Sequence, residues 1–205
     1  MVESISRARR RIAVGTRVGP LQLASISGQV ELPAPERLTH LQFRRFAGCP
    51  VCDLHLHSFA RRHAEIEQAG ISEIVLFHSD EAELRLHAGG LPFALVADPD
   101  KRLYAQFGVE AGTRALGDPR AWPPILLGVL RSLLRVLRGR QPMPSISPQG
   151  GSLGLPADVL IGPSGTVLAC KYGEHAYDQW SVDEVLDLAR AAVGELGGGK
   201  IRVAG

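Results

Sequence analysis

The sequence has few cysteines, few aromatic residues and little net charge. Its 205 residues include three cysteines, and aromatic residues make up 5% of the chain. Small secreted domains held together by disulfides use more cysteines in a shorter chain, so that class is excluded. The 23 basic and 21 acidic side chains leave a formal net charge of +2, which is too small to indicate a protein that binds nucleic acid.

A long uninterrupted hydrophobic run is also missing. The nearest approach, residues 124–137, contains Arg131 and Arg135 and is therefore amphipathic rather than membrane-spanning. The basic residues near the N-terminus are not followed by an apolar run, so neither a signal peptide nor a transit peptide is predicted. We therefore expect a cytoplasmic protein, and in that compartment closely spaced cysteines are catalytic or bind metal.

The most informative feature that is present is the C-x-x-C motif Cys49-Pro50-Val51-Cys52. A helical pattern follows it, and a thiol at a helix N-terminus has a lowered pKa. A second thiol one turn away can attack a mixed disulfide that the first one makes. The motif predicts that Cys49 and Cys52 are catalytic and that Pro50, which stiffens the loop between them, belongs to the substrate-binding surface.

The order of predicted elements indicates one α/β domain over 14–194, between a basic arm at 1–13 and a flexible tail at 195–205. Predicted strands lie at 21–23, 29–32, 38–46, 71–77, 93–97, 159–161 and 166–170. Predicted helices lie at 53–69, 80–87, 100–107 and 181–193. The alternation predicts a central mixed sheet flanked by helices, with an N-terminal hairpin and a helical insertion at about 110–154. A C-x-x-C between a central strand and its helix is the thioredoxin-like arrangement.

Four stretches together resemble the peroxiredoxin-like proteins of the alkyl hydroperoxide reductase/thiol-specific antioxidant group, within the thioredoxin-like superfamily. They lie at 19–30, 46–52, 91–109 and 155–167. The resemblance implies a thioredoxin-like fold and an antioxidant thiol oxidoreductase that needs no bound cofactor. It implies a peroxide or disulfide as substrate, and a thiol protein or small thiol as reductant. It also implies that Pro156 is a cis-proline that faces the dithiol and contacts substrate.

The chain differs from that group beside its reactive cysteine. Cys49 stands at the group's Thr position and Arg45 at its Pro position, if Cys52 is the reactive cysteine. Two orders of attack therefore stay open. Cys52 attacks first in a peroxidase, whereas Cys49 attacks first in thiol–disulfide exchange. In the second case the helix dipole, Arg44 and Arg45 favour a thiolate on Cys49. Residues 41–46 contain no acid of the kind that assists proton transfer in thioredoxins.

Two other interpretations of the cysteines remain open. The first is a zinc or copper site in which the motif is joined by histidines. The candidate ligands are His55, His57 and His175. The second is a pair of buried structural cysteines. Cys170, in a predicted strand, is expected to be a small buried hydrophobic residue.

The segment 122–138 predicts an amphipathic basic helix, since Arg131, Arg135 and Arg138 fall on one stripe. Such a helix binds an anionic membrane surface or a partner, and the chain would then be a non-catalytic interaction module. Alternatively it packs against its own sheet or against a second subunit in a homodimer.

Overall fold

The computed structural model describes residues 11–109, 122–138 and 154–196. The predicted arm before residue 11, most of the predicted tail and much of the insertion lie outside these residues. In the described part of the chain, no helix has the length and apolar character needed to cross a membrane.

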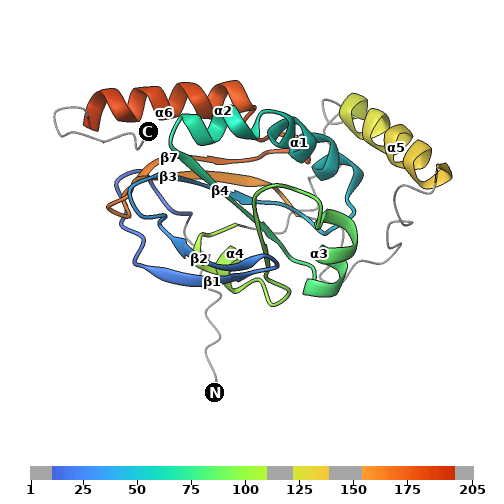
Figure 1. Cartoon of the computed structure of the whole chain (residues 1–205), viewed down its shortest axis with the longest axis horizontal. Coiled ribbons are helices and arrows are strands. Elements are labelled where there is room, and N and C mark those ends of the chain that lie inside the picture. The colour runs from blue at the N-terminus through green and yellow to red at the C-terminus, as the bar shows by residue number, and fades with distance from the viewer. Residues whose placement is uncertain (1–10, 110–121, 139–153, 197–205) are drawn as a thin grey trace, which may run out of the picture.

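Seven strands form one mixed sheet in the order β2-β1-β5-β4-β3-β6-β7 (Figure 1). The strands are β1 (Leu21–Ser25), β2 (Gly28–Leu32), β3 (Leu38–Phe43), β4 (Ile71–Phe77), β5 (Ala94–Ala97), β6 (Ala157–Ile161) and β7 (Val167–Tyr172). β3, β4 and β5 run parallel, while the hairpins β1–β2 and β6–β7 pair antiparallel. The predicted mixed sheet with an N-terminal hairpin is confirmed.

The described residues include six helices. They are α1 (Pro50–Arg61), α2 (His63–Gln68), α3 (Glu81–Ala88), α4 (Arg102–Gln106), α5 (Trp122–Leu137) and α6 (Val182–Leu196). Figure 1 shows α1, α2 and α6 over one face, with α4 and the β1–β2 hairpin on the other. The helix α5 stands beside α1 at the edge of the molecule and supplies the predicted helical insertion.

The predicted helix 53–69 is two helices, which is a difference from the sequence pattern. The backbone leaves helical geometry at Arg62 (φ −111°, ψ 19°), whose N–H bonds to the Phe59 carbonyl in a tighter turn. This turn places the Arg62 guanidinium 2.6 Å from Asp183 at the start of α6. The helix also starts earlier than predicted, because Cys49 takes the cap position and Pro50 the first helical one.

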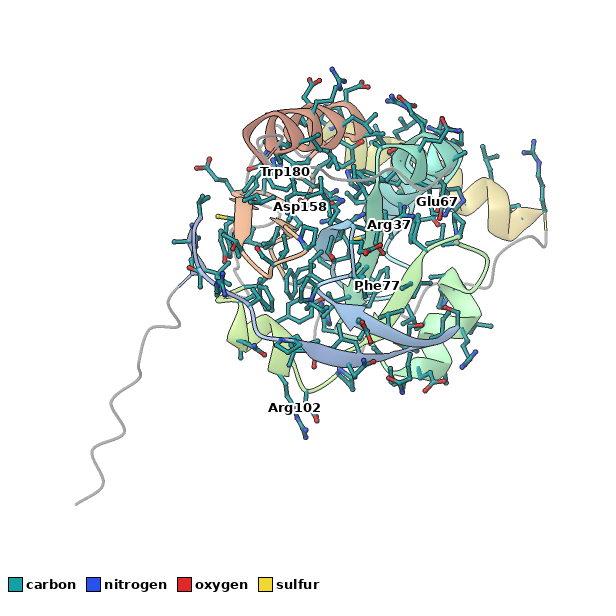
Figure 2. The ribbon with its side chains drawn as sticks, turned by 60° about the vertical axis from the view of Figure 1, so that its left-hand side comes forward. Arg37, Glu67, Phe77, Arg102, Asp158 and Trp180 are labelled. Carbon is teal, nitrogen blue, oxygen red and sulfur yellow. The ribbon has the colours of Figure 1, made fainter. Side chains whose placement is uncertain are left out.

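Two apolar layers hold the helices to the sheet. The layer under α1, α2 and α6 includes Phe59, Ile66 and Val185. The opposite layer includes Phe43 and Phe107 and lies under the β1–β2 hairpin and α4. Figure 2 shows side chains filling the space between sheet and helices, with Asp158 and Trp180 turned inward and Arg102 projecting outward. The central strand β3 is buried along its whole length, so its polar residues need partners inside the protein.

Two predicted helix starts are confirmed in atomic detail. The Asp80 carboxylate accepts the Glu83 N–H at the start of α3. At the start of α6, Ser181 and Glu184 form a reciprocal capping box.

Candidate active site

The two cysteines of the motif lie at the N-terminus of α1, directly after the central strand β3. Cys49 is the cap residue, with an extended backbone (φ −62°, ψ 116°), and its carbonyl accepts the Asp53 N–H at 2.9 Å. Cys52 follows in the first turn. Gly48 precedes them with a φ of +79°, a conformation that favours glycine. Both cysteines are free thiols, and their exposed fractions are 1% and 3%.

A buried arginine faces the pair of sulfurs. Arg45 Nη2 donates to Cys49 Sγ at 3.0 Å. Burial opposes the charge on Arg45, yet the two cysteine sulfurs raise the pKa of its guanidinium above the usual range. The guanidinium therefore lies where it stabilises a thiolate on this pair.

The two thiols share their protons unequally. A hydrogen bond from the Cys49 thiol lowers the pKa of Cys52 to about 6, and the charges of Arg45 and Arg44 act in the same direction against burial. Burial raises the pKa of Cys49 well above its usual range. Although the Arg45 contact falls on the Cys49 sulfur, we assign the negative charge to Cys52, because Cys49 is the thiol that donates. Both shifts favour the form in which Cys52 is the thiolate and Cys49 keeps its proton.

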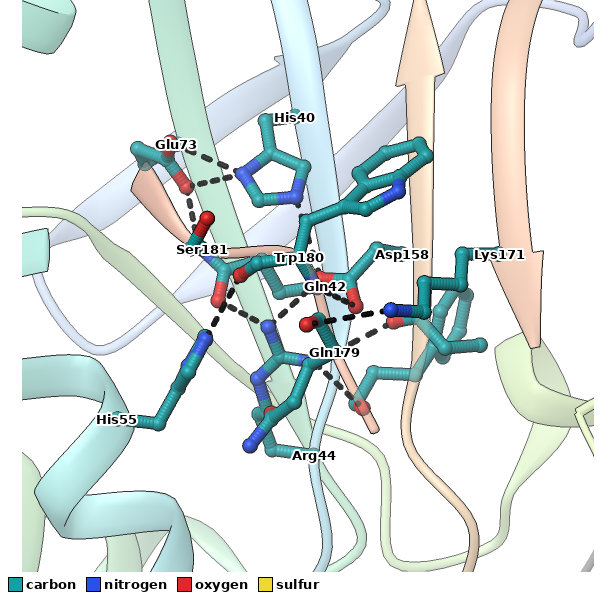
Figure 3. A network of polar contacts seen from close by, with 12 residues as sticks. His40, Gln42, Arg44, His55, Glu73, Asp158, Lys171, Gln179, Trp180 and Ser181 are labelled. Atoms are coloured by element: carbon teal, nitrogen blue, oxygen red, sulfur yellow. Dashed lines mark hydrogen bonds and ion pairs between the residues drawn. The ribbon is translucent and has the colours of Figure 1, made fainter. Parts of the chain in front are cut away.

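A buried ionic network lies behind the cysteines, across strands β3, β4 and β6 (Figure 3). Arg44 Nη2 donates to Asp158 Oδ1 at 2.7 Å. The His40 ring lies between two carboxylates, with Nδ1 at 2.9 Å from Glu73 Oε2 and Nε2 at 3.2 Å from Asp158 Oδ1. Gln42 joins the two halves, because it donates to Glu73 and accepts from Arg44. All four charged side chains are fully shielded from solvent.

The network is close to neutral as a whole. Burial opposes protonation of His40, but Glu73 and Asp158 together raise its pKa to about 9. Burial likewise opposes ionisation of Asp158, and Arg44 and His40 hold its pKa well below the usual range. Two cations therefore face two carboxylates inside the protein, which is the condition under which such burial is tolerated.

His55, on α1 one turn after Cys52, belongs to the edge of this network. Its Nε2–H donates to the Trp180 carbonyl at 2.8 Å. Burial, together with the charge of Arg44, lowers the pKa of His55 to about 3. The ring is therefore neutral and ties α1 to the segment before α6.

A groove runs alongside the first turn of α1, between α1, α3 and α5. Its volume is about 620 Å³, and Pro50 and Gly128 line it. Gly128 approaches so closely that an added Cβ would lie 2.8 Å from the Pro50 carbonyl oxygen. The helix α5 thus packs directly on the backbone of the C-x-x-C motif.

The predicted site residues do not all lie together in the structure. It brings Cys49 and Cys52 together and leaves Pro50 beside the groove. The cis bond predicted at Pro156 is wrong: among the described residues the cis peptide is Leu32–Pro33. Pro156 leads straight into β6 in extended form, and its carbonyl accepts the Gly173 N–H at 2.9 Å.

The histidines proposed as metal ligands contact other residues. His57 lies 3.7 Å from Asp53, and His175 Nδ1 accepts the Tyr177 N–H. Within 11–109, 122–138 and 154–196, no group of three or more His, Cys, Asp or Glu side chains could hold a metal ion. Cys170 is half-buried on β7 rather than fully buried, with its sulfur 3.5 Å from the Ile12 carbonyl oxygen.

Several residues of the site were missed from the sequence. Asp158 on β6 accepts from Arg44, and Glu73 on β4 lies against the His40 ring, so both acids belong to the network beside β3. A signal for them was present, because His40, Gln42 and Arg44 alternate along one face of a strand that is otherwise apolar. Tyr104 was missed as well; its hydroxyl lies against the carbonyls of Arg44 and Leu76, beneath the end of β3.

Comparisons with known proteins place the chain in a family. The sequence model described as AhpC/TSA antioxidant enzyme matches residues 58–175, which is more than half of the chain and begins after both cysteines of the motif. No curated protein matches the sequence.

Solved structures of peroxiredoxins share the fold. A cysteine-to-serine mutant of peroxiredoxin 6 from Arenicola marina is 15% identical, with a TM-score of 0.64 over 92% of this chain and 76% of that one. Peroxidoxin BcpB from Mycobacterium tuberculosis is 18% identical, with a TM-score of 0.58 over 88% and 98%. The reduced 2-Cys peroxiredoxin of Plasmodium vivax is 14% identical, with a TM-score of 0.61 over 91% and 99%. With this peroxiredoxin-type thioredoxin fold and the family match, the chain belongs to the AhpC/TSA antioxidant enzyme family.

Proposed function

We propose that the protein is a thiol peroxidase in which Cys52 attacks the peroxide and Cys49 resolves the product. The observation that carries this proposal is the polarised pair of sulfurs. The pKa of Cys52 is lowered to about 6 by the Cys49 thiol, and the buried Arg45 guanidinium faces both sulfurs. A thiolate present at neutral pH is the form that attacks an O–O bond.

The reaction balances with the groups present. The Cys52 thiolate attacks the outer oxygen of a hydroperoxide, the O–O bond breaks, and the alcohol leaves after taking up a proton. Cys52 is now a sulfenic acid. The Cys49 thiol then attacks this sulfur, which forms the Cys49–Cys52 disulfide and releases water. A thiol reductant, either a protein or a small molecule, supplies the two electrons that restore the dithiol. We place this chemistry in the cytoplasm, where such thiols are abundant.

Peroxide reaches the sulfurs only after a local opening. Both thiols are almost fully buried, and α5 covers the motif through the contact of Gly128 with the Pro50 carbonyl. We propose that α5 moves away from the first turn of α1 during turnover. A surface helix attached through a small residue is the kind of element that opens locally at low cost.

Trapping the sulfenic acid tests the order of attack. After hydrogen peroxide treatment, the Cys49→Ser protein is expected to form a stable adduct with dimedone at Cys52, because no resolving thiol remains. The Cys52→Ser protein is expected to form none and to consume no peroxide. Cys170→Ser serves as the matched control and should behave like the parent. Adduct formation at Cys49 in the Cys52→Ser protein would reverse the assignment.

Thiol–disulfide exchange through Cys49 is the second candidate. It is favoured by the position of Cys49 at the helix cap and by the 3.0 Å contact from Arg45 to its sulfur. In that case a mixed disulfide with a model substrate accumulates in Cys52→Ser and not in Cys49→Ser. The two candidates thus predict opposite trapping variants.

A further inference from the structure

The helix α5 exposes an apolar face for which the fold supplies no cover among the described residues. Six of its leucines have exposed fractions between 41% and 73%. They are Leu126, Leu127, Leu130, Leu133, Leu134 and Leu137. Scattered exposed leucines are ordinary, but a contiguous set on one helix marks a surface that contacts something.

The orientation of the helix is set by its contact with α1. Gly128 faces the protein, because a Cβ there would meet the Pro50 carbonyl oxygen at 2.8 Å. Leu126 and Leu137 are the most exposed leucines, and at 100° per residue both lie about half a turn from Gly128. The smallest residue thus makes the contact. Leu126 and Leu137 point away from the body of the protein, and Leu134 lies at the rim of the groove beside α1.

Basic side chains flank the apolar face. Arg131 and Arg138 line the groove between α1, α3 and α5, and Arg61 joins them from α1. The sequence from 122 to 138 contains three arginines and no acidic residue. Of the residues lining this groove, Asp53 is the acid, and it lies 3.7 Å from the His57 ring.

We propose that α5 binds an anionic membrane surface, with its leucines in the acyl–headgroup boundary and Arg131 and Arg138 against lipid phosphates. An amphipathic helix with an arginine stripe beside a leucine face is suited to lie in the plane of an interface. It spans about 24 Å at 1.5 Å per residue, so it lies on a bilayer rather than crossing one. A second copy would bring the same arginines together without an acid on α5 to pair with them, which is why the anionic surface is favoured.

Membrane binding through α5 determines where the C-x-x-C motif lies relative to the lipid surface. Pro50 lies directly beneath Gly128, so a membrane-bound α5 holds the C-x-x-C motif within one helix diameter of the lipid surface. This inference concerns location alone and holds whether or not the dithiol reacts with peroxide.

Sedimentation of the full-length protein with vesicles tests the proposal without any activity measurement. We expect binding to phosphatidylcholine vesicles that contain phosphatidylglycerol, weak binding to phosphatidylcholine alone, and release at high salt. Leu130→Asp with Leu133→Asp should reduce partitioning at least about tenfold. Arg131→Gln with Arg138→Gln should reduce it about fivefold for each charge removed.

Matched substitutions on α6 provide the controls. Val193→Asp and Arg190→Gln change exposed residues of the same types on another helix, and they should leave binding unchanged. The proposal is overturned if the parent ignores anionic vesicles, or if the leucine substitutions leave binding intact. It is also overturned if those substitutions instead dissolve a dimer seen by analytical ultracentrifugation, because the face would then belong to a second copy.

Discussion

The guanidinium of Arg45 lies 3.0 Å from the sulfur of Cys49, across the tight turn at Gly48 that joins β3 to α1. Arg45, just after β3, and Cys49, the cap of α1, therefore meet across the turn between strand and helix. The Arg45 guanidinium faces both thiols of the motif, and its removal is a direct way to change their chemistry.

We expect Arg45→Gln to slow the reaction of Cys52. The pH midpoint for alkylation of Cys52 by iodoacetamide is measured in Cys49→Ser, which isolates one thiol and keeps a hydroxyl that can donate to its sulfur. The midpoint should rise when Arg45→Gln is added, because the guanidinium charge that lowers the pKa of Cys52 is then gone. Arg85→Gln, which removes an exposed arginine paired with Glu81, is the matched control. An unchanged midpoint in Arg45→Gln would show that the guanidinium does not stabilise the thiolate.

Gly128 packs against the Pro50 carbonyl, and from the proposed opening of α5 we expect Gly128→Val to speed the alkylation of the dithiol. The new side chain cannot fit 2.8 Å from the Pro50 oxygen, and α5 must move off α1. Limited proteolysis should report the same displacement as faster cleavage within 122–138. Gly194→Val on α6, where nothing lies within 4 Å of the added Cβ, is the control and should leave both rates as in the parent. Equal alkylation rates for all three proteins would exclude α5 as the cover.

His40 makes the stability of the protein depend on pH above neutrality. The folded protein holds its proton up to about pH 9, whereas the unfolded chain releases it near 6.5. Between these values the unfolded chain binds fewer protons, so the free energy of unfolding falls as pH rises, by about 3 kcal/mol in all. Cys52 acts in the opposite direction over this range, because its pKa is lowered to about 6 in the folded protein. Urea unfolding of the Cys49→Ser/Cys52→Ser protein from pH 6 to 10 therefore measures the slope that His40 contributes.

His55 acts in the opposite direction below neutrality, because its folded pKa is about 3. Below about pH 6.5 the unfolded chain binds a proton at this histidine that the folded protein does not bind. The free energy of unfolding therefore falls as the pH drops. In the protein that lacks both cysteines of the motif, the two histidines together predict maximal stability near pH 6.5. Adding His40→Gln to that protein should remove the decline above that pH, whereas adding His63→Gln should keep it. No decline between pH 7 and 9 in the protein without the two cysteines would contradict the protonated state of His40.

Substitutions at two glycines with positive φ allow the energetic cost of backbone strain to be measured separately from that of a steric clash. Gly70 (φ +75°) has nothing within 4 Å of an added Cβ, whereas at Gly165 (φ +83°) that atom would lie 2.4 Å from the Val18 carbonyl oxygen. We expect Gly70→Ala to cost about 1 kcal/mol, the price of left-handed backbone in an alanine. Gly165→Ala should cost at least about 2 kcal/mol more, since the Val18 backbone must shift. Equal losses of unfolding free energy in the two variants, measured with urea, would show that the backbone at Val18 shifts without a measurable cost.

Much of the fold follows from local sequence. The strand 71–77 was predicted with its final bounds, because a run of buried aliphatic residues ends at clear turn residues on both sides. The start of the last helix was predicted at residue 181, where Ser181 and Glu184 form a capping box in the structure. The break at Arg62 was not predictable, because residues 53–69 keep one helical pattern across it, and the contact of Arg62 with Asp183 joins residues more than a hundred positions apart.

The candidate site likewise combines a local feature that the sequence predicts with contacts that form only in the folded protein. The spacing of Cys49 and Cys52 is a local feature and was read directly. The partners of His40 and Arg44 come from β4 and β6, which pair with β3 only in the folded sheet. The error at Pro156 has another origin: it was carried over from a family resemblance, and the residue here continues as extended backbone into β6.

The neutral set of two cations and two carboxylates on β3, β4 and β6 constrains how relatives of this chain can diverge. Any single change at His40, Arg44, Glu73 or Asp158 leaves an uncompensated charge in a fully shielded place, at a cost of about 3–5 kcal/mol. Replacing an opposite pair at once, such as Arg44 with Asp158, avoids that cost. Divergence at these sites is therefore expected to proceed in linked pairs, so that the tolerated residue at one position depends on the residue already present at another.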